Sequence, residues 1–313
     1  MAADGLHLRR PAPDEVLVDD GGVTLFRYAL APDLPQREAP RPFLHPIRTR
    51  SGHVVSLNRP HDHVWHKGIA WSLPVVGTEN FWGGSTYIRG RGYVRCDNNG
   101  AQRHRSLESA TVEDDVVRIV HTLDWITQAG GLLFTEERTL TARLLDERAW
   151  LLTFETAMAN VTDAVIPLGS PTTRGRENAG YGGLFWRGPR SFTGGAIVTP
   201  EGVGRGSELR GQRHPWMAFV GSHDEIDAES AVVIADHPDN PRHPPQWFVR
   251  SEEFACLNPA PFFSEEYPLL PDETLRLRYG VVIADAGAAA AGEYAGLAAD
   301  VMAAPRAEVR VGS

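Results

Sequence analysis

The sequence predicts an all-β protein, built as one large antiparallel β-sandwich with a short C-terminal helix. Short runs that alternate apolar and polar residues recur along most of the 313 residues, which is the pattern of half-buried strands. Turn formers are frequent, with 31 Gly and 23 Pro, and they separate these runs. The sequence contains no internal repeat and no long linker, so we expect a single domain over residues 1–313.

The expected strands begin with two hairpins. Residues 15–30 alternate around Gly21-Gly22, and residues 40–57 predict a second pair of short strands around Ser51-Gly52. Further strands are expected where apolar runs lie between turn residues. These runs are Ser106–Val112, Val116–Trp125, Leu132–Leu144, Ala149–Asn160, Trp216–Val220, Ala231–Ala235, Gln246–Arg250, Ala255–Asn258 and Thr274–Ala284.

Three segments depart from the strand pattern. Residues 58–84 and 171–188 lack periodicity and are rich in Gly and in polar or aromatic side chains, so we expect strand edges with a long functional loop in the first and an irregular segment in the second. Residues 286–304 are rich in Ala, with apolar side chains at helical spacing, which predicts the C-terminal helix.

Charge and composition limit the classes of partner that we expect the protein to bind. The formal net charge is −9 and no basic face is concentrated, so we expect no nucleic-acid partner. No window approaches the roughly 20 apolar residues of a membrane helix, so we expect no membrane association. The N-terminus lacks the apolar stretch of a secretory signal, and the two cysteines, Cys96 and Cys256, form no metal or disulfide pattern. We therefore expect a cytoplasmic protein, with its oligomeric state open.

The strongest candidate site is the segment NRPHDHVWHKG, residues 58–68. In an extended strand His61 and His63 would point to one face, and His66 could join them if the chain turns beside it. Imidazoles act as acids and bases near neutral pH, so we expect these three to be catalytic, with Asn58 and Lys67 binding substrate. We predict no cofactor and assign no metal ligand, because the two-histidine zinc helix motif is missing. A divalent metal at the three histidines stays open as an alternative.

Two further segments suit the recognition of a polar ligand. In the first, Asn80 and Trp82 lie beside two glycines, and an aromatic face covers the C–H groups of a sugar while an amide binds its hydroxyls. In the second, Arg174 and Glu177 could orient a substrate through charge-assisted hydrogen bonds. The alternatives are that Trp82 belongs to the core and that Arg174 and Glu177 form a structural ion pair.

The last candidate segment is residues 236–245, which four prolines stiffen. It carries three side chains that suit hydroxyl groups: His237, Asn240 and His243. Trp247 and Arg250 lie on the strand that follows, and we include both as substrate-binding candidates. Glu265 is a late carboxylate that could pair with a histidine as acid and base.

Several of these motifs together resemble one bacterial family, which is labelled methane oxygenase PmoA or treated as a domain of unknown function, DUF6807. They are RPFLHP at 41–46, PHDHVWHKG at 60–68, NFW at 80–82, YGG at 181–183, DHPDNPRHP at 236–244 and NP at 258–259. The resemblance covers about residues 40–284. Members commonly have two histidines before Lys/Arg-Gly, whereas this chain has Trp65-His66, which weakens a metal model that needs both positions.

A second resemblance concerns the closing strands. YPLLPDETLRLRY, residues 267–279, is similar to the end of galactose-mutarotase-like supersandwich domains, which bind sugars with His, Asn, Arg and a late carboxylate. The oxygenase label implies a lipid-spanning subunit, and this chain has no spanning segment, so we favour a sugar-related role.

The two resemblances imply a carbohydrate enzyme of the epimerase, mutarotase or lyase type, which works by acid–base chemistry. A non-catalytic sugar-binding protein and a histidine-dependent metalloenzyme remain alternatives. All of them require the segments 58–84 and 236–245 to meet at one mouth of the sandwich.

Overall fold

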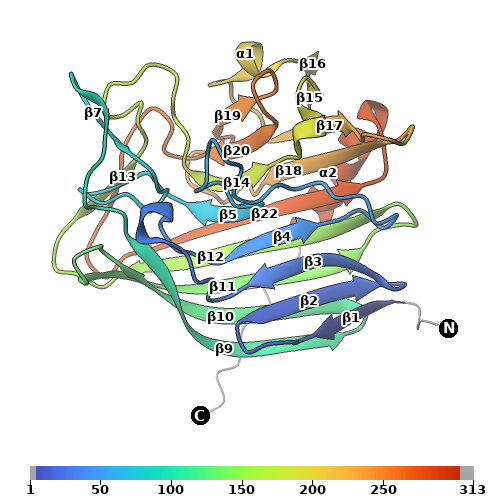
Figure 1. The fold of residues 1–313 in the computed structure, drawn as a ribbon, viewed down its shortest axis with the longest axis horizontal. Coiled ribbons are helices and arrows are strands. Elements are labelled where there is room, and N and C mark those ends of the chain that lie inside the picture. The colour runs from blue at the N-terminus through green and yellow to red at the C-terminus, as the bar shows by residue number, and fades with distance from the viewer. Residues whose placement is uncertain (1–4, 304–313) are drawn as a thin grey trace.

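The computed structural model describes residues 5–303 and confirms the all-β prediction. Two large antiparallel sheets are stacked with their apolar faces together (Figure 1). In spatial order, the eight-stranded sheet contains β1 (Leu6–Arg9), β2 (Glu15–Asp20), β3 (Val23–Ala29), β4 (Phe43–Ile47), β5 (Ile69–Ser72), β14 (Gly183–Arg187), β20 (Cys256–Ala260) and β19 (Gln246–Arg250).

The nine-stranded sheet contains the longest strands, and four of these, β9 to β12, lie beside the N-terminal strands of the other sheet (Figure 1). Its spatial order is β16 (Gly202–Gly204), β15 (Ala196–Thr199), β17 (Trp216–Ser222), β18 (Glu229–Asp236), β22 (Thr274–Ala284), β12 (Ala149–Asn160), β11 (Leu132–Leu144), β10 (Val116–Ile126) and β9 (Ala101–Glu113).

Smaller elements extend one end of the sandwich. A three-stranded sheet joins β21 (Tyr267–Leu269), β13 (Ile166–Gly169) and β6 (Val75–Val76), and a separate hairpin joins β7 (Thr86–Ile88) to β8 (Gly92–Val94). The remaining elements are helix α1 (Gly206–Leu209), helix α2 (Ala291–Ala303) and short 3₁₀ turns at Gln36–Glu38, Arg190–Phe192 and Ala288–Ala290.

Helix α2 packs on the outer face of the nine-stranded sheet. Ala298 and Met302 lie over β22 at Gly280, where a Cβ atom would come within 3.1 Å of the Ala298 side chain. The missing side chain at Gly280 lets the helix approach the strand closely. The helix begins at Ala291 rather than at Ala286 as predicted, because residues 288–290 form a 3₁₀ turn, and residue 304 lies outside the described residues.

Most predicted strands are confirmed, and two predictions are wrong. The segment 171–188 is not irregular throughout, since β14 lies in the middle of the eight-stranded sheet. Its five residues are too short a run to show periodicity. Around Ser51-Gly52 only β4 is a full strand, and the second strand is reduced to an isolated bridge between Arg48 and Val54.

Within residues 5–303, no helix combines the length and the apolar character that crossing a membrane requires.

Candidate functional site

The candidate site lies on the outer face of the eight-stranded sheet, over β14, β20 and β19. Side chains alternate along a strand, so Leu184 and Trp247 enter the core between the sheets while Phe185 and Phe248 project from the outer face. Loops that cross this face leave a cavity of about 480 Å³ above these aromatic rings.

We call this cavity the aromatic pocket. Its walls combine large aromatic side chains with a smaller set of charged and polar ones. It is lined by Asp62, His63, Trp65, His66, Trp82, Gly83, Ser85, Tyr93, Arg176, Tyr181, Phe248, Arg250, Glu253 and Phe254. A concave site with an apolar lining and a few convergent polar groups is typical of small-molecule binding.

The histidine segment forms two successive turns, so the extended geometry that would point His61 and His63 to one face is absent. The backbone N–H of His63 donates to the Pro60 carbonyl at 3.0 Å, and the N–H of His66 donates to the His63 carbonyl at 2.9 Å. These turns stack the His63 and His66 rings at a centroid distance of 4.7 Å. His61 is therefore exposed outside the pocket, where Arg190 Nη2 lies 3.1 Å from its Nδ1 atom.

Asp62 joins the histidine turn to the charged groups around it. Its Oδ2 atom lies 3.2 Å from His63 Nδ1, at an angle outside the usual hydrogen-bond range, and its Oδ1 atom accepts a bond from Arg190 at 2.9 Å. Partial burial opposes ionisation of Asp62. The hydrogen bond from its own backbone N–H and the contacts with His63 and Arg190 outweigh burial and lower its pKa to about 2. Asp62 is thus a carboxylate at neutral pH, next to an imidazole.

His66 forms part of the pocket floor. Its side chain is 5% exposed, and its ring packs against those of Phe185, Trp82 and Phe254. Burial, together with nearby positive charges, lowers its pKa well below the ordinary value, so the ring is neutral at physiological pH. Its Nδ1 atom is buried and has no hydrogen-bond partner within residues 5–303. A buried polar atom of this kind is costly unless something else binds it.

Asn80 shapes the pocket without lining it. Its side chain is buried, and its Oδ1 atom accepts bonds from the backbone N–H groups of Trp82 and Gly83 at 2.9 and 3.0 Å. Gly83 has φ 101° and lies against Trp65 and the Glu38 backbone, where a side chain would not fit. This turn holds the Trp82 ring, which is 5% exposed, at the wall of the pocket.

The rim contains charged and phenolic side chains that the sequence pattern did not single out. Tyr93 and Tyr181 are joined by their hydroxyls at 2.9 Å, and Arg176 donates to the Tyr93 hydroxyl with its guanidinium 4.7 Å from that ring. On the other side, Arg250 forms an ion pair with Glu253 at 2.6 Å. Of these, Arg250 was predicted as a binding residue.

Lys67 and Asn58 lie behind the pocket. Lys67 is fully buried, and its ammonium binds the Glu38 carboxylate and the Val64 carbonyl. Burial lowers the pKa of Lys67 to about 8, although Glu38 opposes the shift. Asn58 pairs with Lys67 in an isolated β-bridge. Neither side chain lines the pocket, and Lys67 serves to hold the histidine turn against Glu38.

The segment 236–245 lines no part of the aromatic pocket, so the prediction that it meets segment 58–84 at one binding site is wrong, and β19 and residues 253–254 complete the pocket instead. Asn240 is buried and binds Asp236 and the Arg278 backbone, each at 2.7 Å. His243 Nδ1 lies 2.7 Å from the other Asp236 oxygen, and His237 Nε2 lies 3.3 Å from the Met302 carbonyl of helix α2. The loop thus closes on the ends of β18, β22 and α2, and none of its residues lines the aromatic pocket.

The remaining predicted site residues also lie outside the aromatic pocket. Trp247 lies in the core and donates from its indole N–H to the His214 carbonyl at 2.8 Å. Glu177 is exposed, and the Glu265 carboxylate is 79% exposed beside Arg242. Arg174 lines a second pocket and pairs with Glu266 at 3.3 Å.

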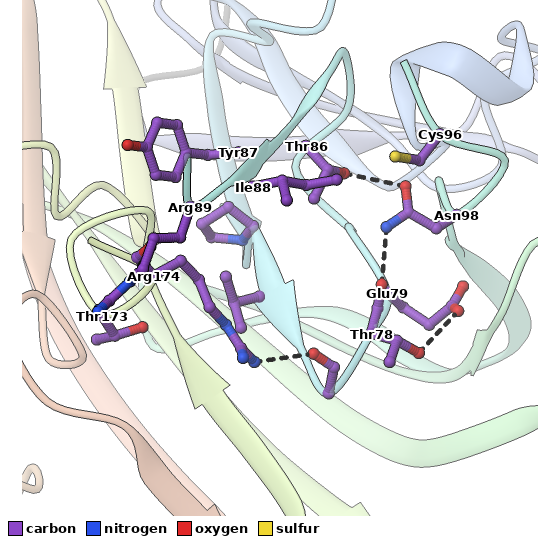
Figure 2. A pocket seen from close by; sticks show the side chains of 13 residues that line it. Thr78, Glu79, Thr86, Tyr87, Ile88, Arg89, Cys96, Asn98, Thr173 and Arg174 are labelled. Carbon is purple, nitrogen blue, oxygen red and sulfur yellow. Dashed lines mark hydrogen bonds between the residues drawn. The ribbon is translucent and has the colours of Figure 1, made fainter. Parts of the chain in front are cut away.

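This second pocket, the hairpin pocket, has a volume of about 590 Å³ and lies between the β7–β8 hairpin, β6 and the turn at 173–174. Figure 2 shows that its polar side chains bond to their neighbours. Arg174 donates to the Gly77 carbonyl at 3.1 Å, and Asn98 binds the Thr78 carbonyl and the Thr86 hydroxyl at 2.7 and 3.0 Å (Figure 2).

Within residues 5–303, no group of three or more His, Cys, Asp or Glu side chains is arranged to hold a metal ion. His61 points away from the pocket toward Arg190, and His63 and His66 stack face to face with 23° between their planes. The described geometry does not assemble the metal alternative at these three histidines.

The amino-acid sequence matches one known protein family. It belongs to the family of unknown function DUF6807, whose model matches residues 15–299. No curated protein matches the chain.

Among solved structures, three similar ones are carbohydrate enzymes by name. The galactosidase domain of alpha-galactosidase-sucrose kinase, AgaSK, has 10% identity and a TM-score of 0.46, with 90% of this chain and 42% of that chain covered. The alpha-galactosidase from Lactobacillus brevis has 9% identity and a TM-score of 0.37, with 90% and 40% covered. A heparan sulfate lyase HepC mutant from Pedobacter heparinus has 9% identity and a TM-score of 0.38, with 91% and 36% covered.

This chain therefore spans about two fifths of the length of the solved chains that it matches. With TM-scores below 0.5, these likenesses support no statement about what this chain binds or does.

Proposed function

We propose that this protein is an enzyme that converts a sugar or sugar derivative by acid–base chemistry in the aromatic pocket. The observation that carries the proposal is the Asp62–His63 contact of 3.2 Å at a pocket walled by Trp65 and Trp82. An imidazole beside an ionised carboxylate is a proton acceptor, and aromatic walls suit the C–H faces of a sugar ring.

The roles of Asp62 and His63 follow from their positions. We assign the proton of the neutral His63 ring to Nδ1, the nitrogen that lies 3.2 Å from the Asp62 carboxylate, which leaves the lone pair of Nε2 as a base. When Nε2 takes a proton from a sugar hydroxyl or from a carbon next to a carbonyl, the Asp62 charge stabilises the imidazolium. Because the pKa of Asp62 is about 2, Asp62 stays ionised and returns no proton itself.

Substrate positioning is assigned to the floor and the walls. The neutral His66 ring forms part of the floor, and Trp82 and Phe254 provide faces for the ring of the sugar. The volume of about 480 Å³ falls in the range of small-molecule sites, about 300–1,000 Å³.

The expected cytoplasmic location stays a prediction.

NMR of the protein with a panel of neutral and acidic monosaccharides tests this function. We expect one sugar to show accelerated anomeric exchange or new product signals, and His63→Ala to slow that turnover by about 10²–10⁴-fold with the fold intact. His223→Ala is the matched control, because His223 lies outside the pocket near His53.

Unchanged turnover in His63→Ala, with His223→Ala equal to it, would contradict the acid–base role. Sugars that bind to the pocket but are never converted would show the binding-protein alternative to be right instead.

A further inference from the structure

We infer that the ligand of the aromatic pocket is an anionic sugar carrying a carboxylate, which Arg176 receives at the rim. The inference rests on the proposed function, because it names the substrate class of the same pocket. It comes from the charges around the pocket, most of which cancel in pairs inside the protein.

Two ion pairs lie at the pocket wall. Asp62 is bound by Arg190 at 2.9 Å, and Arg250 is bound by Glu253 at 2.6 Å. Each pair leaves no net charge at the pocket wall. Asp62 and Glu253 are the only carboxylates among the lining residues, all of which belong to the described chain. The anions of the pocket are therefore already matched by arginines.

Arg176 is the arginine of the pocket lining that takes part in neither of these ion pairs. Its guanidinium donates to the Tyr93 hydroxyl and lies over that ring, and it forms an ion pair with no carboxylate of residues 5–303. A guanidinium has five donors in a planar fork, so one phenolic oxygen leaves most of them free. The fork matches the two oxygens of a carboxylate.

Arg187 is a second uncompensated cation, beneath the floor. It follows Phe185 by two positions on β14 and so lies on the same outer face of the sheet. The side chain is fully buried, its Nε and Nη1 atoms have no hydrogen-bond partner in the described part of the chain, and its guanidinium packs 3.9 Å from the Phe254 ring centroid.

Burial lowers the pKa of Arg187 to about 10, so the group stays charged at neutral pH. A buried charge with incomplete hydrogen bonding costs stability, and an anion bound nearby would offset part of that cost. The lining residue Phe254 covers Arg187, so the positive charge of Arg187 lies behind the pocket floor. From there it makes the electrostatic potential of the pocket more positive without touching a ligand. Arg176 is accessible from the pocket and makes the contact.

Calorimetric titration of the whole chain tests the inference with named probes. The probes are D-galacturonate and D-glucuronate, the neutral sugars D-galactose and D-glucose, and D-glucose 6-phosphate. We expect a uronate to bind at least about tenfold more tightly than its neutral counterpart, which corresponds to about 1.4 kcal/mol. We also expect that affinity to fall as salt is raised, because exposed charges are screened.

Substitutions locate the contact. Arg176→Gln should lose about tenfold in uronate affinity and leave the affinity for the neutral sugar unchanged, and Arg176→Lys should recover part of the loss because it keeps the charge without the fork. Arg105→Gln is the matched control, since Arg105 is 62% exposed on β9, outside the pocket. Arg176 is only partly buried, so folding should survive in each variant.

The outcomes separate the two proposals. Equal affinity for uronate and neutral sugar, or full uronate affinity in Arg176→Gln, overturns the anionic ligand while the sugar function stands. Preference for the phosphate over the uronates overturns the carboxylate. If none of the probes binds, both the sugar function and this inference fail.

Discussion

The aromatic pocket and the hairpin pocket are neighbours of similar volume, about 480 and 590 Å³, yet they differ in how their polar groups are bonded. In the hairpin pocket Arg174 and Asn98 bind backbone and side-chain partners of the same wall. In and beneath the aromatic pocket, His66 Nδ1 and two nitrogens of Arg187 have no partner. The first arrangement stabilises the fold, and the second costs stability that a ligand could offset.

The β7–β8 hairpin and the turn beside it separate the two pockets. Tyr93 on β8 and Arg176 line the aromatic pocket, whereas Tyr87 on β7 and Arg174 line the other. Arg174 and Arg176, two positions apart in the sequence, thus line different pockets, which the sequence pattern could not distinguish. The two pockets differ in the hydrogen bonding of the buried polar groups around them, and incomplete bonding of such groups is the feature that favours the aromatic pocket as the ligand site.

The largest expected effect contrasts two buried cations near the aromatic pocket. Lys67→Met should destabilise the protein by about 2–3 kcal/mol, because it removes the fully buried partner of Glu38 and leaves that carboxylate with Arg59 alone. Arg187→Met should cost far less or stabilise the fold, since it removes a buried charge whose Nε and Nη1 atoms are unpaired. Urea denaturation measures both. Equal destabilisation by the two variants would contradict the distinction between a structural and an uncompensated cation.

A smaller effect is expected in the hairpin pocket. Asn98→Ala removes the bonds to the Thr78 carbonyl and the Thr86 hydroxyl and should destabilise the protein by about 1–3 kcal/mol. Sugar binding measured by calorimetry should not change. A loss of sugar affinity with stability unaltered would show instead that the hairpin pocket is the binding site.

A further expected effect concerns the pH dependence of stability. The folded protein keeps His66 neutral because burial lowers its pKa, whereas the unfolded chain binds a proton at this position below about pH 6.5. The contribution of His66 to stability is therefore complete above about pH 6.5 and decreases as the pH falls, by up to about 1.4 kcal/mol per pH unit.

His66→Phe should remove the contribution of His66 to the loss of stability at acidic pH. The contributions of His45 and His121 should remain, because burial also lowers their pKa values. Denaturation of both proteins from pH 7 to pH 4 gives the two slopes. Identical slopes would mean that His66 is protonated in the folded protein.

Strand positions were predictable, and the site was predictable only in part. Period-two alternation with turn residues identified strands such as β10 and β11, because each has one face in the core. The same rule also separates Trp247 from Arg250, which are three positions apart and so lie on opposite faces of β19. It would have pointed to Phe248 as the partner of Arg250 in the pocket.

Other features depend on contacts between distant segments. The two turns that stack His63 on His66 do not follow from residue spacing, and nothing local marks Phe254 or Tyr93 as lining residues. The prolines of 236–245 indicated a rigid loop, but rigidity does not tell which end of a sandwich a loop occupies. Its histidines are bonded to Asp236 and to the end of helix α2 instead.

A crystal structure of the protein with a bound monosaccharide from the panel above is the most direct test of the central claim. The claim predicts that the sugar lies in the aromatic pocket, with a ring face on Trp82 or Phe254 and a hydroxyl or reacting carbon within reach of His63 Nε2. A sugar seated in the hairpin pocket, or one that leaves His63 and His66 uncontacted, would contradict it.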